Sequence, residues 1–297
     1  MNEKLHSFDA SPKPDSDLEL GAHVYSLAAK VAWGQASKEQ LGMAVRALLD
    51  ELAPQVPSKK YTRINVLDHG YVRLVDYMGS DLSIARAARV SYDADWRAGE
   101  DEGSDKRLIN YLWRNHHTTP FEAVTFTFEI KAPIFVFRQW HRHRTWSYNE
   151  QSARYTELCD EFYVPQPEHI GAQDPKNKQG RTIDPGEAGK AVAAQLLFQA
   201  RKVEAERVKN NMEAAFALYK QLLAENWPRE LARLHLPLAT YSRMFATVSL
   251  LNLFRFLTLR TDEHAQYEIR VYANALIELA RIVAPVAVAA WENVGQK

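Results

Sequence analysis

The sequence has little cysteine and no excess of charge, and both absences narrow what the protein can be. Its 297 residues include 1 cysteine, so no disulfide can form within the chain, as is usual in reducing compartments. Cys159 is followed by Asp160 and Glu161, which disfavour a thiolate, so we expect no catalytic cysteine. Lysine plus arginine and aspartate plus glutamate both number 37. This balance argues against broad nucleic-acid binding, which needs a strongly basic face.

Long apolar runs and several common motifs are also missing. No stretch reaches the roughly 18 apolar residues of a membrane-spanning helix. The first 20 residues are polar and acidic, so we expect no secretory signal and a cytoplasmic protein without a membrane partner. Neither a Gly-x-Gly-x-x-Gly nor a P-loop pattern occurs, so side-chain cations would have to hold any dinucleotide. The histidines at 116, 117, 141 and 143 lack metal-ligand spacing and neighbour arginines, so we expect no metal site. We expect residues 116–122 to form a turn whose polar tips enter a cleft.

The apolar pattern predicts strands in the middle of the chain and long helices on either side. Residues 1–17 are predicted to form a disordered arm, followed by helices near 20–33 and over 37–53, the second opened by the capping box Ser37-Lys38-Glu39-Gln40. After a linker at 57–63 we expect a hairpin over 64–75 turning at 68–70, a helix over 82–90, a strand over 124–130 and a helix over 133–140. A loop over 171–189 should then precede helices near 190–224, 228–259 and 262–284. We expect a helix break after Arg260, and Asp262 should cap the last helix. This order predicts an α+β fold, with an N-terminal extension at 1–60 and a catalytic domain at 61–297.

Cationic side chains concentrate in residues 141–155, HRHRTWSYNEQSARY, although the chain is neutral. Arg142, Arg144 and Arg154 carry planar guanidinium groups that suit phosphate, as does His143 when it is protonated. Glu150 would repel a bare phosphate, but it can accept hydrogen bonds from a base or a ribose. With the aromatic and hydroxyl side chains nearby, the mixture favours a nucleotide site. The alternative is a solvated, salt-bridged surface turn.

Residues 142–152 also match a known signature, Arg-His-Arg followed after seven residues by serine. Four separated blocks match in the same order: DLSIARAARVSY (81–92), HHTTPFEAVTFTFEIKAPIFVFRQW (116–140), SYNEQSARY (147–155) and LRTDEHAQYEI (259–269). From about Tyr61 to Trp291 the chain resembles the flavin-dependent thymidylate synthases. The resemblance implies reductive methylation of dUMP to dTMP, with 5,10-methylenetetrahydrofolate as carbon donor, NADPH as reductant, FAD as cofactor and no cysteine nucleophile. It also implies an antiparallel-strand-containing central sheet and a homotetramer whose subunits share active sites.

The resemblance assigns roles to individual positions. For FAD it implies Ser91, His117, Thr119, Glu122, Arg142, His143, Arg144 and Glu150. For dUMP it implies Gln139, Arg142, Glu150, Gln151, Ser152, Ala153, Arg154, Arg233 and Arg260, with Ser152, Arg154 and Arg233 at the phosphate. Arg260 matches the arginine credited with polarising the uracil, since a fixed cation stabilises charge on the ring and makes C5 nucleophilic. The rival view makes Ser152 a nucleophile, but the sequence offers it no evident activating base.

One block departs from the family pattern. Where the family has Asn-Ala-Arg and another Asn a turn later, this chain has Ser249-Leu250-Leu251 and Arg255. The FAD-contacting Asn and Arg are therefore missing at positions 249 and 251. Because residues four apart share a helix face, we expect Arg255 to supply the cation missing at Leu251. Alternatively, Arg255 lies on the surface and the other half-site holds FAD.

Two other functions remain open from the sequence. One is a non-catalytic nucleotide- or RNA-binding protein that stacks bases on the arginine- and aromatic-rich stretch. The other is a flavin-deficient paralogue that binds dUMP. Neutral charge and the retained Arg260 argue against the first, and we expect no nucleic-acid partner.

The first 60 residues could pack on the core, cover the cleft or widen a subunit interface.

Overall fold

The computed structural model describes residues 59–182 and 191–295, together with a few positions before residue 59. The chain divides into two compact units, Met1–Ser58 and Lys59–Lys297. In the first unit the predicted capping box is present. Gln40 N donates to Ser37 Oγ over 3.1 Å, and Ser37 N donates to Gln40 Oε1 over 2.9 Å. The predicted arm at 1–17 lies outside the described residues.

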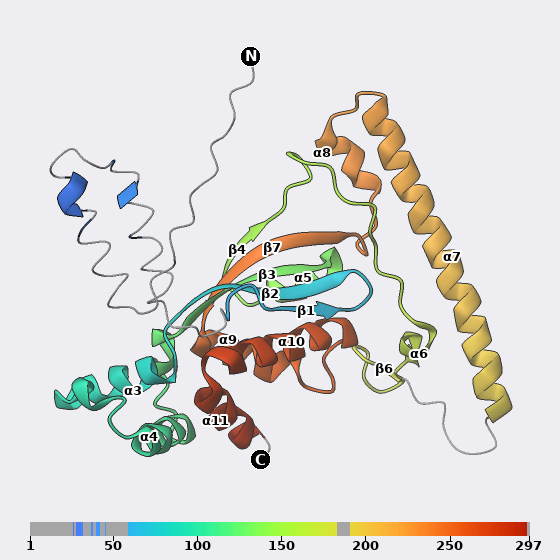
Figure 1. Ribbon diagram of the computed structural model, residues 1–297. Helices are drawn as coiled ribbons and strands as arrows, with labels where there is room; N and C mark the ends of the chain where they lie inside the picture. Colours follow the sequence, from blue (N-terminus) through green and yellow to red (C-terminus); the bar gives the residue numbers. More distant parts are fainter. Residues whose placement is uncertain are drawn as a thin grey trace. The chain divides into compact units, whose positions relative to one another are not determined.

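A five-stranded antiparallel sheet forms the centre of the second unit (Figure 1). In spatial order its strands are β1 (Arg63–Val66), β2 (Gly70–Met78), β3 (Thr125–Pro133), β7 (Tyr241–Ser249) and β4 (Ser147–Glu150). β1 and β2 form the predicted hairpin, and β3 is the predicted alternating strand. A separate small hairpin, β5 (Ala172–Gln173) with β6 (Arg181–Thr182), lies within the predicted loop.

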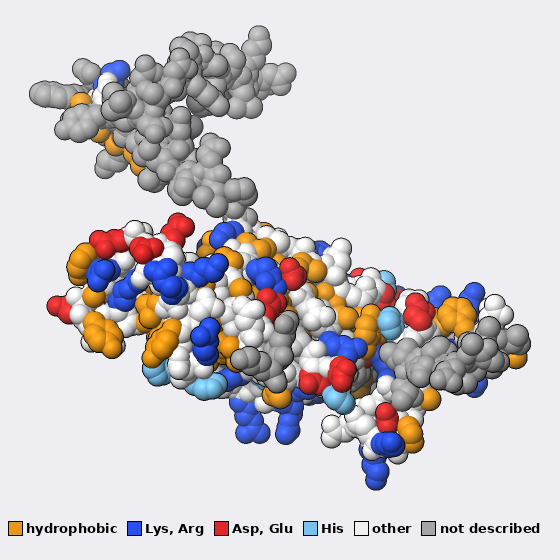
Figure 2. Space-filling view, turned by 90° about the horizontal axis from the view of Figure 1, so that it is seen from below, with side chains coloured by type: hydrophobic (Ala, Val, Ile, Leu, Met, Phe, Trp, Pro, Cys, Tyr) orange, Lys and Arg blue, Asp and Glu red, His pale blue; other side chains and the backbone are white. Residues whose placement is uncertain are grey.

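Helices surround this sheet, which confirms the predicted α+β class. They are α3 (Asp81–Arg89), α4 (Glu102–Arg114), α5 (Ile134–Trp140), α6 (Pro167–Ile170), α7 (Ala191–Ala224), α8 (Arg229–Ala232), α9 (Leu250–Arg260), α10 (Tyr267–Val283) and α11 (Pro285–Gly295). Among the described residues, no helix is long and apolar enough to cross a membrane. On the face shown in Figure 2, basic and acidic side chains are interspersed, as the balanced composition leads one to expect.

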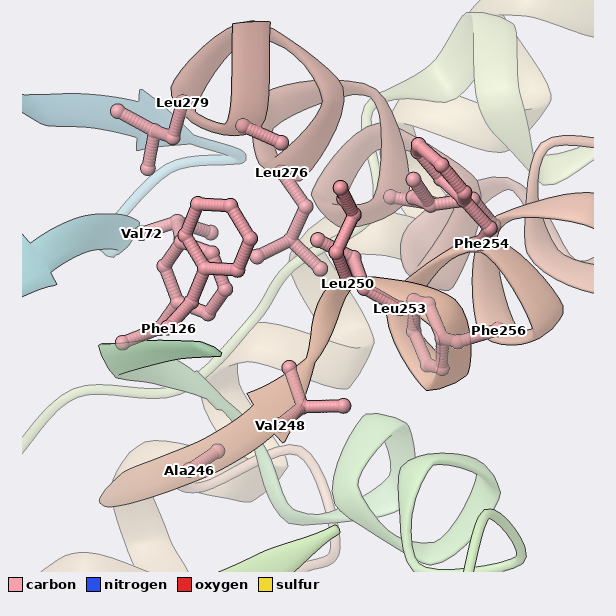
Figure 3. Packing of buried hydrophobic residues seen from close by; sticks show 14 of the residues in the cluster. Val72, Phe126, Ala246, Val248, Leu250, Leu253, Phe254, Phe256, Leu276 and Leu279 are labelled. Carbon is pink, nitrogen blue, oxygen red and sulfur yellow. The ribbon is translucent and has the colours of Figure 1, made fainter. Parts of the chain in front are cut away.

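The main core lies between the sheet and helices α9 and α10 (Figure 3). Val72 and Phe126 from the sheet meet Leu276 and Leu279 of α10, and all four side chains are fully buried. Burying one such side chain contributes about 1.5–3 kcal/mol. A smaller core of Phe216, Tyr219, Leu222 and Ala232 joins α7 to α8. The short 3-10 helix Arg233–His235 follows α8 directly, and Leu236 after it packs against this second core.

The helix predicted over 228–259 is wrong, because its centre is strand β7. β7 is an inner strand between β3 and β4. Met244, Ala246 and Val248 are buried on its core face, whereas Arg243 and Phe245 are exposed on the other. Methionine and alanine favour helices and an exposed phenylalanine obscures the alternation, so the strand pattern was hidden. Hydrogen bonding to β3 on one side and β4 on the other makes this segment a strand.

The predicted helix end at Arg260 is confirmed, but the next helix does not begin at Asp262. Instead, Asp262 Oδ1 accepts a hydrogen bond from His264 N over 2.8 Å, which makes a turn. α10 begins at Tyr267 with Gln266 as its N-cap. Asp262 therefore stabilises the connection before the helix rather than the helix itself.

Candidate functional site

A pocket of about 360 Å³ lies where α5, strand β4 and the 3-10 helix after α8 meet. Its lining residues are Ile134, Arg138, Glu150, Gln151, Ser152, Ala153, Leu158, Arg233, Leu236 and Ser242. The fold thus brings residues 150–153 together with Arg233, which lies far along the sequence from them. These are five of the residues that we expect to bind dUMP. We call this cavity the β4 pocket.

Main-chain N–H groups hold the chain from Glu150 to Arg154 by donating hydrogen bonds. Gln151 N donates to Arg243 O of β7 over 2.7 Å, which extends the β4–β7 pairing by one step. Arg154 N donates to Ser152 Oγ over 3.3 Å. Within the described part of the chain, no histidine or carboxylate hydrogen-bonds to this hydroxyl. Among these residues the structure therefore shows no activating base beside Ser152, which a serine nucleophile would need.

The β4 pocket carries two cations and one carboxylate. Arg138 and Arg233 lie with Glu150 in its lining, which suits an anionic group attached to a polar ring. Arg154 is not in the lining; it is exposed and pairs with Glu230 over 3.5 Å, a surface pair of little energy. The sequence interpretation missed Arg138. It lies within the helix expected over 133–140, just before the cationic stretch at 141–155 that the sequence interpretation considered.

A second group of expected residues meets at Arg260, the last residue of α9. Arg260 Nε donates to His143 Nε2 over 3.0 Å, and Nη2 donates to Gln139 O over 3.3 Å. Burial, followed by the charge of Arg260, lowers the pKa of His143 to about 4. His143 is therefore neutral at neutral pH and does not meet the condition under which it would bind phosphate. Tyr148 fixes the turn by donating its hydroxyl to His143 O over 2.8 Å.

The other arginines of the signature remain exposed. Neither the Arg142 nor the Arg144 guanidinium has a hydrogen-bond or ion-pair partner within the residues that the structure describes. Cys159 is also exposed and has a free thiol. In the same described ranges, no three His, Cys, Asp or Glu side chains converge as a metal site would require.

A further pocket, of about 530 Å³, lies between α3, α4 and the 3-10 helix Thr119–Ala123. Its lining residues are Ala87, Ala88, Ser91, Tyr92, Leu108, Tyr111, Leu112, His117, Thr119 and Pro120. It brings together Ser91, His117 and Thr119, three of the residues expected to contact FAD. Glu122 is exposed and lies outside the lining. Two aromatic residues, Tyr92 and Tyr111, were not expected here. We call this the α3–α4 pocket.

The residues at the start of α9 are arranged differently from a ligand-binding face. Leu251 is 3% exposed and belongs to the main core, so its side chain offers little surface to a ligand. Ser249 Oγ accepts from Asn252 Nδ2 over 3.2 Å. Arg255 is exposed and donates from Nη1 to Asn252 Oδ1 over 3.0 Å. Arg255 thus presents a cation at the surface one turn beyond the buried Leu251.

The two pockets lie at opposite ends of β3. Thr119 and Pro120 of the α3–α4 pocket precede this strand, and Ile134 of the β4 pocket follows it. A strand of 9 residues spans roughly 27 Å. Within one chain the two pockets are therefore separate cavities at opposite ends of this strand.

Comparison with known proteins places this geometry in a family. Residues 73–286 match the family model described as thymidylate synthase complementing protein. The flavin-dependent thymidylate synthase of Treponema pallidum is 46% identical over 231 residues, covering 78% of this chain and 72% of that protein. That of Ruegeria pomeroyi is 44% identical over 242 residues, covering 82% and 77%.

A solved structure agrees with the sequence matches. The UMP/dUMP methylase PolB from Streptomyces cacaoi, bound with 5-Br dUMP, is 35% identical with a TM-score of 0.62, and the match covers 77% of this chain and 97% of that one. The family model spans most of the chain, and relatives above 40% identity cover more than three quarters of it. The chain therefore belongs to the family of flavin-dependent thymidylate synthases.

Proposed function

We propose that this enzyme methylates dUMP to dTMP, with 5,10-methylenetetrahydrofolate as carbon donor, NADPH as reductant and FAD as cofactor. The observation that carries the proposal is the β4 pocket, where residues 150–153 meet Arg233. Its two arginines suit the phosphate of dUMP, and the Glu150 carboxylate suits a ribose or base donor. The named relatives act in flavin-dependent thymidylate synthesis or methylate dUMP, which supports the assignment.

Arg260 is the residue we assign to activation of the base. Two hydrogen bonds, to His143 and to the Gln139 carbonyl, fix its guanidinium. No carboxylate neutralises it within the described residues. A preorganised cation of this kind stabilises negative charge that develops on the pyrimidine, so that C5 can attack the one-carbon unit. This role requires no covalent bond to Cys159 or Ser152.

The α3–α4 pocket is the part of the chain that fits FAD. Its volume of about 530 Å³ holds part of a dinucleotide, and its hydroxyl, imidazole and phenol groups can donate to pyrophosphate or pack on an adenine. Ser91, His117 and Thr119 would bind the cofactor there, and the exposed guanidinium groups of Arg142, Arg144 and Arg255 would bind its phosphates. When bound, FAD would supply the hydride-transfer chemistry of the reaction.

The separation of the pockets supports a shared active site. Roughly 27 Å along β3 exceeds any contact distance between a flavin ring and a nucleotide base. We therefore propose that the α3–α4 pocket of one subunit faces the β4 pocket of another, in the homotetramer that the family resemblance implies. The reductant and the folate of this reaction are metabolites of the cytoplasm, where we place the enzyme.

The direct test uses the colour and reactivity of the purified full chain. We expect a yellow protein, or one that becomes yellow with added FAD. We expect NADPH to reduce its flavin under anaerobic conditions, and dTMP to form when dUMP and the folate are present. A protein that cannot be reconstituted with FAD but binds dUMP would instead be a flavin-deficient paralogue. Flavin-free binding of RNA with no dUMP affinity would indicate the nucleic-acid alternative.

A further inference from the structure

The buried carboxylate of Glu268 lines neither of the two pockets. It is 1% exposed and sits in the first turn of α10. Its Oε1 accepts from the Tyr163 hydroxyl and from Arg181 Nη2, each over 3.0 Å. Its Oε2 accepts from Gln266 Nε2 over 2.9 Å. Paired with the Arg181 guanidinium, the carboxylate is an acceptor on both oxygens.

This carboxylate determines which way two amide side chains point. An ionised carboxylate can face only the NH₂ end of Gln266, which leaves Gln266 Oε1 on the opposite side. Gln266 Oε1 in turn accepts from Gln139 Nε2. The orientation of Gln139 therefore follows from the donor and acceptor chemistry of its neighbours. Within the described residues, Gln139 Oε1 has no partner and remains an acceptor.

Gln139 connects this chain of hydrogen bonds to the base-activating arginine. Its main-chain oxygen accepts from Arg260 Nη2 over 3.3 Å. A uracil ring near Arg260 presents an N3–H donor between two carbonyl oxygens. An acceptor is thus what a uracil N–H needs from Gln139, whereas the N3 of cytosine is itself an acceptor and would need a donor.

We propose that Glu268 is a positioning residue for base recognition, which acts through Gln266 to hold Gln139 with its Oε1 toward the ring N–H of uracil. The inference rests on the proposed function, because it takes the dUMP base to lie beside Gln139 and Arg260. It extends that function by naming the source of preference for uracil over cytosine.

The decisive variant is Glu268→Gln, which keeps the size of the side chain. Tyr163 and Arg181 both donate to the Oε1 side, so the new amide must keep its oxygen there and turn its NH₂ toward Gln266. Gln266 then has to offer its oxygen to position 268 and its NH₂ to Gln139. Gln139 flips in response and presents a donor to the base. The hydrogen-bond pattern that selects uracil becomes the one that selects cytosine.

The measurement is equilibrium binding of dUMP and of dCMP to the full chain with excess FAD. We expect the unaltered chain to prefer dUMP and Glu268→Gln to reduce the dUMP-to-dCMP affinity ratio by about tenfold, the effect of one mismatched hydrogen bond. Gln266→Ala, at an exposed position, should lower the ratio in the same direction because Gln139 is then free to turn. Tyr163→Phe is the matched control: it removes one donor from Oε1 and leaves Arg181 and Gln266 in place, so the ratio should be unchanged.

The possible results distinguish a failure of this inference from a failure of the proposed function. A purely structural role would weaken both nucleotides alike, so an unchanged ratio in Glu268→Gln and Gln266→Ala would overturn the inference. The same would hold if Tyr163→Phe lowered the ratio as much as Glu268→Gln. If the unaltered chain did not bind dUMP, the proposed function would fail and this inference with it.

Discussion

Arg260 Nε donates a hydrogen bond to His143 Nε2 over 3.0 Å, which joins the end of α9 to the turn after α5. The accepting nitrogen must be unprotonated, so His143 is a neutral imidazole with its proton on Nδ1. Burial is the larger cause of its lowered pKa of about 4, and the charge of Arg260 is the second. The arginine is held in place by a partner that does not neutralise it, which leaves its charge available to a bound base.

This pair makes stability fall as the solution is acidified. The pKa of His143 is about 4 in the folded chain and close to its ordinary 6.5 in the unfolded chain. As the pH falls from 6.5 to 4, the unfolded state binds a proton that the folded state does not, so the free energy of unfolding decreases, and below pH 4 the effect is complete. We expect His143→Gln, whose amide oxygen can still accept from Arg260, to lack this part of the pH dependence. Denaturant midpoints at about pH 7, 5.5 and 4.5 measure it, and equal slopes in both proteins would contradict the assignment.

Replacing Arg260 by lysine should damage the chemical step more than binding. Lysine keeps the charge but cannot donate to both His143 and the Gln139 carbonyl from one planar group. We expect kcat for dTMP formation to fall about 100-fold or more, as when an oxyanion donor is removed, with a smaller change in KM for dUMP. Arg207→Lys, at an exposed position of α7, is the control and should leave both constants unchanged. A change in KM alone would show that Arg260 only binds substrate.

The fold was predictable where one segment carries its own pattern. Strand β3 alternates along its length, and α7 follows a glycine- and proline-rich loop, so both were expected. Helix α11 was not, because its N-terminal hydrogen bonds come from elsewhere: Asp81 accepts from Val286 N and from Ala287 N, each over 2.9 Å. No local capping motif precedes that helix. A cap supplied by a residue 205 positions away cannot be inferred from the sequence next to the helix.

The candidate site was predictable only in part, because its side chains come together from distant parts of the sequence. Motif matching found residues 150–153 and Arg233, which the fold brings into one pocket. It missed Arg138, which the resemblance had not singled out, and Glu268, whose effect passes through Gln266. The family pattern has an FAD-contacting arginine at position 251, but here Leu251 packs in the core between sheet and helices. Side-chain burial depends on tertiary packing, so a family position and a ligand-facing position need not coincide.

Arg233 should contribute to dUMP affinity, because it is a cation in the lining of the β4 pocket. We expect Arg233→Ala to weaken dUMP binding by about tenfold to a hundredfold, the range for a charge-assisted hydrogen bond. Arg229→Ala removes an arginine one turn earlier that is outside the lining and pairs loosely with Glu157 over 3.8 Å. That control should bind dUMP normally. Titration calorimetry at two salt concentrations distinguishes them, and equal losses would indicate a general electrostatic effect instead.

Cys159 should be dispensable for catalysis. It is exposed, it lies outside the β4 pocket, and the mechanism we propose forms no bond to the enzyme. We expect Cys159→Ser to retain dTMP formation within about twofold, since a surface substitution of this kind changes stability by about 0.5 kcal/mol or less. The measurement is steady-state turnover before and after treatment of the unaltered chain with a thiol-alkylating reagent. Loss of activity in both experiments would reinstate a cysteine nucleophile.

Arg255 should contribute to FAD binding through its charge. Its guanidinium is exposed and is oriented by Asn252, one turn beyond the position where the family pattern has an arginine and this chain has Leu251. We expect Arg255→Ala to weaken the binding of FAD by about tenfold, because one charge-assisted hydrogen bond to a phosphate is lost. The flavin-to-protein ratio after gel filtration and a reconstitution titration measure this. Arg207→Ala, at an exposed site on α7, is the control and should keep its flavin.

Restoring an arginine at position 251 would not be an equivalent rescue, because Leu251 is buried in the core. Undiminished flavin retention in Arg255→Ala would assign FAD binding to the α3–α4 pocket and the signature arginines alone.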